Sequence, residues 1–340
     1  MPIPRRAASF VIAGLMAACC ATAARADVNL YTTREPGLIK PLLDAFEDKT
    51  GVKVNTVFMK DGLAERVLAE GANSPADVLM MVDFGNLVDL KEKGVTQAIS
   101  SAILDESIPS QLRDKDGHWF ALSVRARVLY AAKDLDLKSF KYEQLSDPKW
   151  KGKVCIRSGQ HPYNTALIAD YIAHHGAEKA EAWLKGVKAN LGRKAAGGDR
   201  DVAKDILGGI CDIGIGNSYY VGLMRSPKAP PEQQEWGKAI KVVLPTFENG
   251  GTQVNVSGAA IAKNSPNKAD AVKLLEYLVS DDEQAIYAKG NYEYPVKPGA
   301  KPDPLIAELG TLTPDKTPLA AIAAHRKEAS QLVDKVGFDQ

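Results

Sequence analysis

Short strand patterns alternate with longer helical patterns at the start of the chain. Residues 27–33, 52–59 and 76–83 read as strands, and residues 38–51 and 62–71 read as helices. Leu42 and Phe46 belong to the helical spacing of the first helix, which is predicted to end at Gly51. This βαβαβ order predicts a parallel sheet with helices on both faces. Ligands of such sheets bind outside the carboxyl ends of the strands.

The same rhythm begins again further along the chain. Strands are expected over residues 151–158 and 211–216, with helices over 164–176 and 177–190 between them. Two long β-rich runs, residues 119–133 and 241–263, are expected to join two α/β units as a two-strand hinge. From Asn267 onward the pattern is mostly helical. We therefore predict an N-lobe of residues 27–124 and 250–300 and a C-lobe of residues 125–249 and 301–340.

The first 26 residues are typical of an export signal. Arg5 and Arg6 form its positive region, and the apolar run from Phe10 to Ala18 is too short to span a bilayer. Ala24-Arg25-Ala26 provides a cleavage site, so the mature chain is predicted to begin at Asp27. The arginine pair also allows a twin-arginine route, which RRAASF matches poorly. Cys19 and Cys20 allow a lipoprotein reading, but the residues before them fit a lipobox badly.

The charge of the mature chain argues against some partners. Loss of Arg5, Arg6 and Arg25 reduces the 43 basic residues to 40, against 42 acidic ones, a net charge of −2. Nucleic-acid and anionic-membrane partners need a strong positive excess. Since no later segment holds about twenty apolar residues, we expect the mature chain to be soluble and not inserted in a membrane. We also expect it to be a monomer.

Cys155 and Cys211 remain in the mature chain, at the ends of neighbouring apolar segments. Disulfides persist in compartments outside the cytoplasm. A Cys155–Cys211 disulfide is therefore favoured over two buried free thiols, although the sequence does not give the Cα separation that a disulfide requires.

Two adjacent tyrosines, Tyr219 and Tyr220, follow an Asn-Ser step at the end of an apolar run. A strand places neighbouring side chains on opposite faces, and a helix places them about 100° apart. At a junction between elements, however, both rings can be directed at one point. Asn217 and Ser218 are good residues to begin a helix, whose N-terminus favours negative charge.

The chain resembles the periplasmic ferric-iron-binding proteins of bacterial ABC importers, within the type II periplasmic solute-binding superfamily. The N-x-Y-Y step is the most specific part of the resemblance, which covers nearly the whole mature chain in these stretches: VNLYTTREPGLIKPLLDAFEDKTGVKVN, PADVLMMVDFGNLVDLKEKGV, LSVRARVLYAAKD, LSDPKWKGKVCIRSGQHPYNTALIADYIAHHG, GICDIGIGNSYYVGLM, QVNVSGAAIAKNSPNKADAVKLLEYLVSDDEQ and NYEYPV. It implies a two-lobed clamp in the periplasm that binds Fe(III) in its cleft and delivers it to an inner-membrane permease.

The resemblance also implies a set of metal ligands. Tyr219 and Tyr220 would supply phenolate oxygens, which are the hard donors that a trivalent cation prefers; the alternative is a pair of half-buried rim aromatics with satisfied hydroxyls. A third ligand tyrosine is expected at Tyr163, where the alternative is a packing role beside Pro162; nearby His161 is the weaker ligand candidate. The loop after the first strand departs from the family, because Glu35 stands where many relatives carry a histidine. Glu35 is therefore either a carboxylate ligand or a solvated loop residue.

Three phenolates leave coordination positions on Fe(III) open, and the family often fills them with a synergistic anion such as carbonate. Arg125 matches the family position for holding this anion, as a planar fork donor can. Arg127, Arg34 and Asn217 are further candidates; the alternative for the arginines is a surface or hinge ion pair. Asp83 is expected to line the cleft. Tyr31, at the end of the first strand, is expected to pack in the core.

Two other classes of function fit less well. An enzyme is disfavoured because the histidines show no HExxH spacing, and the chain has no G-x-S-x-G, P-loop or GxGxxG motif. A binder of an organic cation, such as thiamine or a polyamine, is the stronger alternative, since tyrosines can act as stacking platforms. Colour distinguishes the two binders, because phenolate-bound Fe(III) absorbs visible light.

Overall fold

The computed structural model describes residues 27–340. The predicted export signal, its cleavage site and the alternative at Cys19 and Cys20 all lie outside these residues. Within the described part of the chain, every helix is too short or too polar to cross a membrane.

The first α/β unit forms as predicted. Strands β1 (Val28–Thr32), β2 (Val54–Phe58) and β3 (Val78–Met81) are parallel, with β1 in the middle. Helix α1 (Pro36–Thr50) buries Ile39, Leu42, Leu43 and Phe46. It ends at Gly51, whose φ of 69° lies in the left-handed region that glycine adopts without strain. The positions of these strands and of α1 thus follow directly from the spacing of the apolar residues in the sequence.

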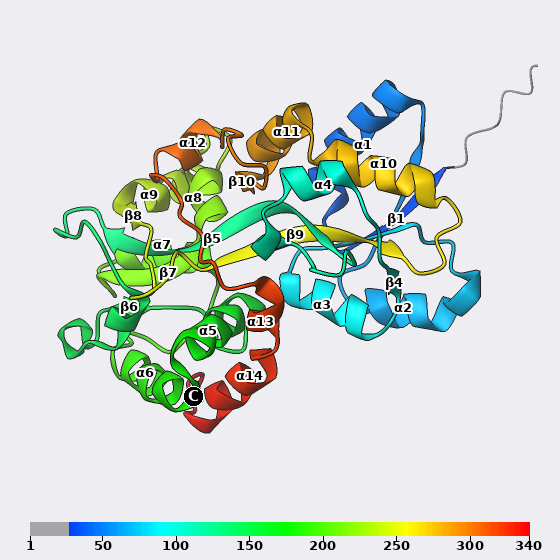
Figure 1. Cartoon of the computed structure of the whole chain (residues 1–340). Helices are drawn as coiled ribbons and strands as arrows, with labels where there is room; N and C mark the ends of the chain where they lie inside the picture. The colour runs from blue at the N-terminus through cyan, green and yellow to red at the C-terminus, as the bar shows by residue number, and fades with distance from the viewer. Residues whose placement is uncertain (1–26) are drawn as a thin grey trace, which may run out of the picture.

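Two long antiparallel strands connect the two halves of the molecule (Figure 1). They are β5 (Phe120–Ala132) and β9 (Val254–Ala262), and nearly all of their residues are buried. The first part of β5 pairs with β9, and its last part pairs with β7 (Ile213–Asn217) and β8 (Ile240–Val243). The resulting strand order, β2-β1-β3-β9-β5-β7-β6, makes β5 and β9 the connection that the sequence predicted.

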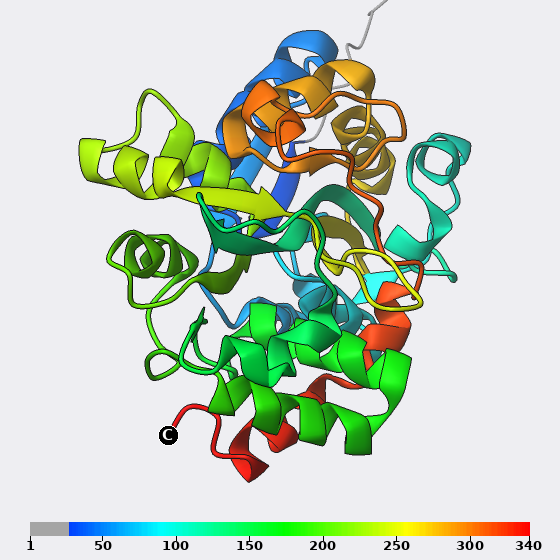
Figure 2. The same ribbon diagram turned by 90° about the vertical axis from the view of Figure 1, so that its left-hand side faces the viewer.

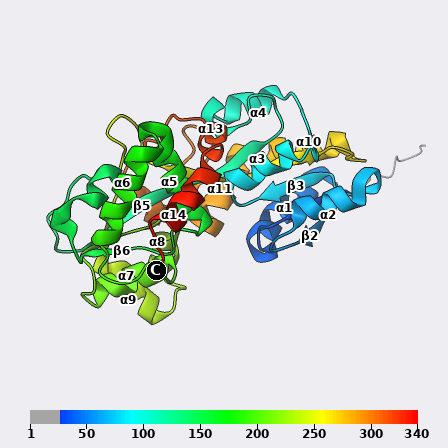
Figure 3. The ribbon, with the colours of Figure 1, turned by 90° about the horizontal axis from the view of Figure 1, so that it is seen from below.

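The second unit lies on the other side of these strands, as the view from below also shows (Figure 3). Strand β6 (Val154–Cys155) runs parallel to β7. Its helices are α5 (Pro162–His175), α6 (Ala177–Ala189), α7 (Asp199–Leu207), α8 (Ser218–Arg225) and α9 (Pro231–Ala239). The first unit carries the helices α2 (Leu63–Glu70), α3 (Phe84–Glu92), α4 (Ala102–Ser107), α10 (Lys268–Leu278) and α11 (Asp281–Asn291), with short strand β4 (Thr96–Gln97).

The C-terminal part returns across the molecule. Strand β10 (Tyr294–Pro295) pairs with β5, and α12 (Pro304–Ala307) contacts α8. Helices α13 (Leu319–Ala323) and α14 (Arg326–Lys335) then pack on α5, as the turned view shows (Figure 2), while α13 also contacts α3 of the first unit. The residue boundaries proposed for the lobes stay a prediction.

Two strand predictions differ from the structure. The run over residues 241–263 is divided, because β8 ends at Val243 and β9 begins at Val254. Pro245 and the Glu248–Gly251 stretch lie between them, and proline and glycine interrupt a strand. The strand predicted over residues 151–158 shortens to the two residues of β6.

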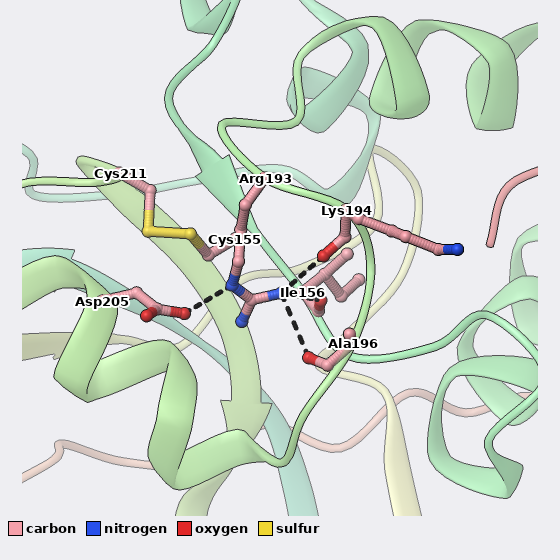
Figure 4. Close-up of a disulfide and its surroundings, with 7 residues drawn as sticks. All are labelled: Cys155, Ile156, Arg193, Lys194, Ala196, Asp205 and Cys211. Carbon is pink, nitrogen blue, oxygen red and sulfur yellow. Dashed lines mark hydrogen bonds and ion pairs between the residues drawn. A yellow bond between two sulfur atoms is a disulfide. The ribbon is translucent and has the colours of Figure 1, made fainter. Parts of the chain in front are cut away.

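The disulfide between Cys155 and Cys211 forms as favoured (Figure 4). It joins the end of β6 to the residues just before β7, with the two Cα atoms 5.8 Å apart. Beside it, the Arg193 guanidinium forms an ion pair with Asp205 and donates to the backbone carbonyls of Ile156, Lys194 and Ala196. These contacts hold the chain where it leaves β6.

Candidate functional site

A cavity of about 240 Å³ lies where the two units face each other. On the side of the first unit it is reached by the loops after β1 and β3 and by the end of α11. On the other side it meets the first turns of α5 and α8. Its lining consists of Thr33, Arg34, Glu35, Leu38, Val82, Arg125, Tyr163, Tyr219, Leu223, Asn291 and Glu293.

The tyrosine pair sits at a strand-to-helix junction, as predicted. Strand β7 ends at Asn217 and α8 begins at Ser218, so Tyr219 and Tyr220 lie in the first turn of the helix. Their ring centroids are 4.2 Å apart. Tyr163 lies in the first turn of α5, and its hydroxyl oxygen is 3.4 Å from that of Tyr219. Two helix N-termini, whose dipoles favour anions, therefore bring the three tyrosines together.

The tyrosine hydroxyls interact electrostatically. Burial, and then the neighbouring Tyr163 and Tyr220, raise the pKa of Tyr219 well above its usual value. Burial also raises the pKa of Tyr220. These phenols are therefore neutral near pH 7 unless a cation replaces their protons, as a bound metal ion does.

Arginines surround the rings. The guanidinium carbons of Arg125, Arg127 and Arg157 lie 5.8, 6.0 and 5.3 Å from the ring centroid of Tyr163. Arg200 lies 5.4 Å from the ring centroid of Tyr220. Neither Arg157 nor Arg200 was predicted as a site residue, although Arg157 stands two residues after β6, at the carboxyl end of a parallel strand. Together these guanidinium groups surround the tyrosine cluster with positive charge.

Two buried arginines of the cavity converge on Ser257. Arg34 donates to Ser257 Oγ at 2.5 Å, and Arg125 donates to the same oxygen at 2.8 Å. Arg34 also pairs with Glu293 at 3.0 Å and donates to the Tyr287 hydroxyl at 2.6 Å. Burial lowers the pKa of Arg34, but its surroundings, Glu293 first and then Tyr287, together raise this pKa overall. Glu293 was not predicted as a site residue; it lies in the NYEYPV stretch.

Arg127 and Asn217 occupy a buried network beside the cavity and are not among its lining residues. Arg127 donates to Asp199 at 2.6 Å, to Asn217 Oδ1 at 3.0 Å and to Asn164 Oδ1 at 2.6 Å. Asn217 directly precedes α8, but its side chain makes no capping hydrogen bond to the helix. Both side chains are thus engaged with protein partners.

The other predicted residues take several positions around the site. Glu35 is exposed on the cavity rim, just before α1. His161 directly precedes α5, and its Nδ1 accepts the backbone N–H of Tyr163 at 3.2 Å. Tyr31 is buried, as expected, with its hydroxyl donating to Glu70 at 2.9 Å.

Asp83 is buried and caps a helix near the cavity. Its Oδ1 accepts the backbone N–H groups of Gly85 and Asn86 at the start of α3. Its Oδ2 accepts from Asn255 of β9 at 2.7 Å. Asp83 is absent from the cavity lining, where the preceding Val82 takes its place.

Comparison with known proteins places this arrangement in a family. Residues 73–309 match the family model described as bacterial extracellular solute-binding protein. The chain belongs to this family. It is similar to the solved Bordetella ferric binding protein, with 65% identity, a TM-score of 0.90 and coverage of 93% of this chain and 100% of that one.

Two further relatives carry related descriptions. A Trichodesmium protein solved in complex with iron and citrate ligands shows 41% identity and a TM-score of 0.87, covering 92% of this chain and 100% of its own. Iron uptake protein A2 of Synechocystis is 38% identical over 94% of this chain and 92% of its own length. These likenesses confirm the predicted resemblance to periplasmic ferric-iron-binding proteins and the two-lobed α/β fold.

Proposed function

We propose that this chain binds Fe(III) at the cavity through the phenolates of Tyr163 and Tyr219, which line it, and of Tyr220, whose ring packs on that of Tyr219 beside it. The observation that carries the proposal is the 3.4 Å separation between the hydroxyl oxygens of Tyr163 and Tyr219 on two different helices. Fe(III) prefers hard, negatively charged oxygen donors, and three phenolates balance its charge. Glu35 on the rim is a candidate for a further ligand supplied by the first unit.

A small anion completes the coordination in this proposal. Arg34 and Arg125 line the cavity, and fork-shaped guanidinium groups suit bidentate anions such as carbonate or citrate carboxylates. Arg127 and Asn217 act one step back in this scheme, because neither lines the cavity and Arg127 donates to Asp199, to Asn164 Oδ1 and to Asn217 Oδ1. The relative solved with iron and citrate supports an anion beside the metal.

The alternative of an organic cation is less favourable on charge. Arg34 and Arg125 both line the cavity, and the Glu293 carboxylate that could face a cation is paired with Arg34. An organic cation does not replace the phenol protons as a metal ion does, so no phenolate charge would offset these guanidinium groups. The family consists of solute-binding proteins, and we propose a transport rather than an enzymatic role for this member.

In the proposed cycle the mature protein acts as a monomer in the periplasm, after removal of residues 1–26. It takes up iron, its two units hold the ion between them, and it delivers the ion to the permease of an ABC importer. The family description as extracellular solute-binding protein supports this place in the cell.

Metal analysis tests the function. Apo-protein loaded with ferric citrate and passed through gel filtration should retain one iron per chain and absorb visible light. A Tyr31→Phe variant is the matched control, because the hydroxyl that it removes donates to Glu70 and does not face the cavity. Retention of an organic solute with no iron and no visible band would contradict the proposal.

A further inference from the structure

A second group of metal-ligating side chains lies away from the tyrosines. Asp170 and His174 are one helical turn apart on α5, and Asp315 comes from the segment between α12 and α13. One ligand atom from each residue lies within 4.8 Å of the other two. His174 Nε2 is 3.1 Å from Asp315 Oδ2 and 3.7 Å from Asp170 Oδ1. The three residues are distinct from those that line the tyrosine cavity.

Asp170 is the unusual member of this group. Its side chain is fully buried, and neither carboxylate oxygen has a hydrogen-bond partner within residues 27–340. Burial, and then the neighbouring Asp315, raise the pKa of Asp170 well above its usual value. Buried carboxylates are normally paired, hydrogen-bonded or bound to a metal. Both carboxylate oxygens of Asp170 are therefore free to bind a cation.

The other two members are held in place by their surroundings. The His174 ring stacks on Phe247 with centroids 4.2 Å apart. Backbone N–H groups of Gly251 and Thr317 donate to the two oxygens of Asp315, each at 2.8 Å. A side chain at Gly250 would collide with both Asp315 and His174, so the glycine allows their close approach. Such outer contacts orient ligands in metal sites.

The geometry between His174 and Asp315 also suits a shared cation. Although His174 Nε2 lies 3.1 Å from Asp315 Oδ2, the two atoms make no hydrogen bond. Ligands that bind zinc at about 2.0–2.2 Å in a tetrahedron are about 3.4 Å from each other. The separations of 3.1 and 3.7 Å lie on either side of that value.

We propose that Asp170, His174 and Asp315 form a second, divalent-cation site that is independent of iron binding. Two carboxylates balance the charge of a divalent ion, and one imidazole nitrogen with two oxygens suits a borderline metal such as Zn²⁺. Three protein ligands leave a position for water, which the 13% exposure of the His174 side chain allows.

The position of the site gives it a structural consequence. Asp315 donates its backbone N–H to Thr252 at 2.8 Å, and Thr252 donates to Thr313 at 2.8 Å, just before β9 begins. A cation would therefore tie α5 to the segment that passes the connecting strands and continues into α13. Bound Zn²⁺ should stabilise the folded chain, and above the Kd this stabilisation should increase with the logarithm of the free zinc concentration.

The test uses full-length mature protein carrying Tyr163→Phe, Tyr219→Phe and Tyr220→Phe, so that the tyrosine cavity cannot compete for metal. After chelator treatment and addition of ZnCl₂, calorimetry and metal analysis should show one Zn²⁺ per chain. Adding His174→Gln or Asp315→Asn should weaken binding at least a hundredfold. His175→Gln is the matched control, because this neighbour pairs with Glu143 instead.

Several results would overturn the site. These are no zinc bound by the triple-tyrosine variant, or binding that His174→Gln and Asp315→Asn leave unchanged. If those two variants fail to fold, Co²⁺ replaces zinc in the triple-tyrosine protein. X-ray absorption should then show one imidazole with oxygen ligands, and a shell without imidazole contradicts the proposal. Because iron binding is measured separately in the unmodified protein, failure here leaves the iron proposal standing.

Discussion

The hydroxyl oxygens of Tyr163 and Tyr219 lie 3.4 Å apart, although 56 residues separate them in the sequence. Each tyrosine lies in the first turn of a helix, α5 or α8, that follows one of two neighbouring parallel strands, β6 and β7. The carboxyl ends of such strands meet at one edge of the sheet. The topology of the second unit therefore brings the two phenols together.

Removing a phenol should remove iron affinity with little change in fold. Tyr219→Phe and Tyr220→Phe each keep the ring and lose one anionic oxygen, so we expect iron affinity to fall by at least about a hundredfold, or roughly 3 kcal/mol. Tyr163→Phe should act in the same way. Competition with citrate, followed by the visible absorption band, measures both effects. Full affinity with an unchanged band in all three variants would contradict the assignment.

Iron binding should weaken as the pH falls. Burial and its neighbours raise the pKa of Tyr219, so this phenol holds its proton near neutral pH and must release it to bind iron. Each such phenol should make the apparent affinity fall by roughly tenfold per pH unit. Affinities measured by competition at pH 8, 7 and 6 test the slope. The Tyr219→Phe variant should release one proton fewer, whereas a slope of zero would contradict phenolate ligation.

Two arginines on β5 should respond differently to substitution. Arg125→Lys keeps a positive charge but loses the planar fork, so iron affinity in bicarbonate buffer should fall roughly tenfold, with less change in bicarbonate-free buffer. Arg127→Met should instead cost about 3–5 kcal/mol of unfolding free energy, because it leaves the buried Asp199 carboxylate without this partner. Urea unfolding and iron competition separate the two effects. Equal behaviour of both variants in both assays would contradict this division.

The sequence predicts secondary-structure elements and candidate site residues better than it predicts which distant residues contact each other. The alternation of apolar spacing is enough to place α1, β1 and the junction at Tyr219, because these depend on local contacts. Glu293 could not be found in this way, since its role depends on Arg34, which lies 259 residues away.

Arg127 illustrates the same limit on the other side of the cavity. Its type and position suit anion binding, but its partner Asp199 lies 72 residues further along the chain. The helix that carries Asp199, α7, was not predicted, although its buried Val202, Ala203 and Ile206 recur at helical spacing. A residue's type therefore shows what it can do, and its folded neighbours decide what it does.

Loss of the disulfide should lower the free energy of unfolding and leave the iron affinity nearly unchanged. The bond closes a loop of 56 residues, and its removal should cost up to about 4 kcal/mol of unfolding free energy. A Cys155→Ala, Cys211→Ala protein avoids buried hydroxyl groups and should keep its iron affinity within about threefold at 25 °C. Alkylation with intact-mass measurement checks the bond in the parent. Two adducts without reductant would show free thiols instead.

His161 should make the apo-protein sensitive to mild acid. Burial, followed by the charges of Arg157 and Arg127, lowers the pKa of His161 from 6.5 to about 4. Its Nδ1 accepts the Tyr163 backbone N–H, which a protonated ring could not do. Because the folded-state pKa is the lower one, the neutral ring contributes stability above about pH 6.5. That contribution is lost as the pH falls towards 4, since the unfolded chain takes up the proton first.

The size of this effect can be measured with a capping residue that does not titrate. Partial solvent exposure reduces the contribution to about 1–2 kcal/mol between pH 6.5 and 4.5. His161→Asn keeps a side-chain acceptor at the start of α5, so its unfolding free energy should fall less steeply with acid than that of the parent. Urea unfolding of both proteins across this range gives the difference. His325→Asn is the control for replacing an imidazole elsewhere, because the native His325 side chain is 39% exposed and lies outside α5. Parallel curves for the parent and His161→Asn would show that the imidazole at the start of α5 does not govern the acid response.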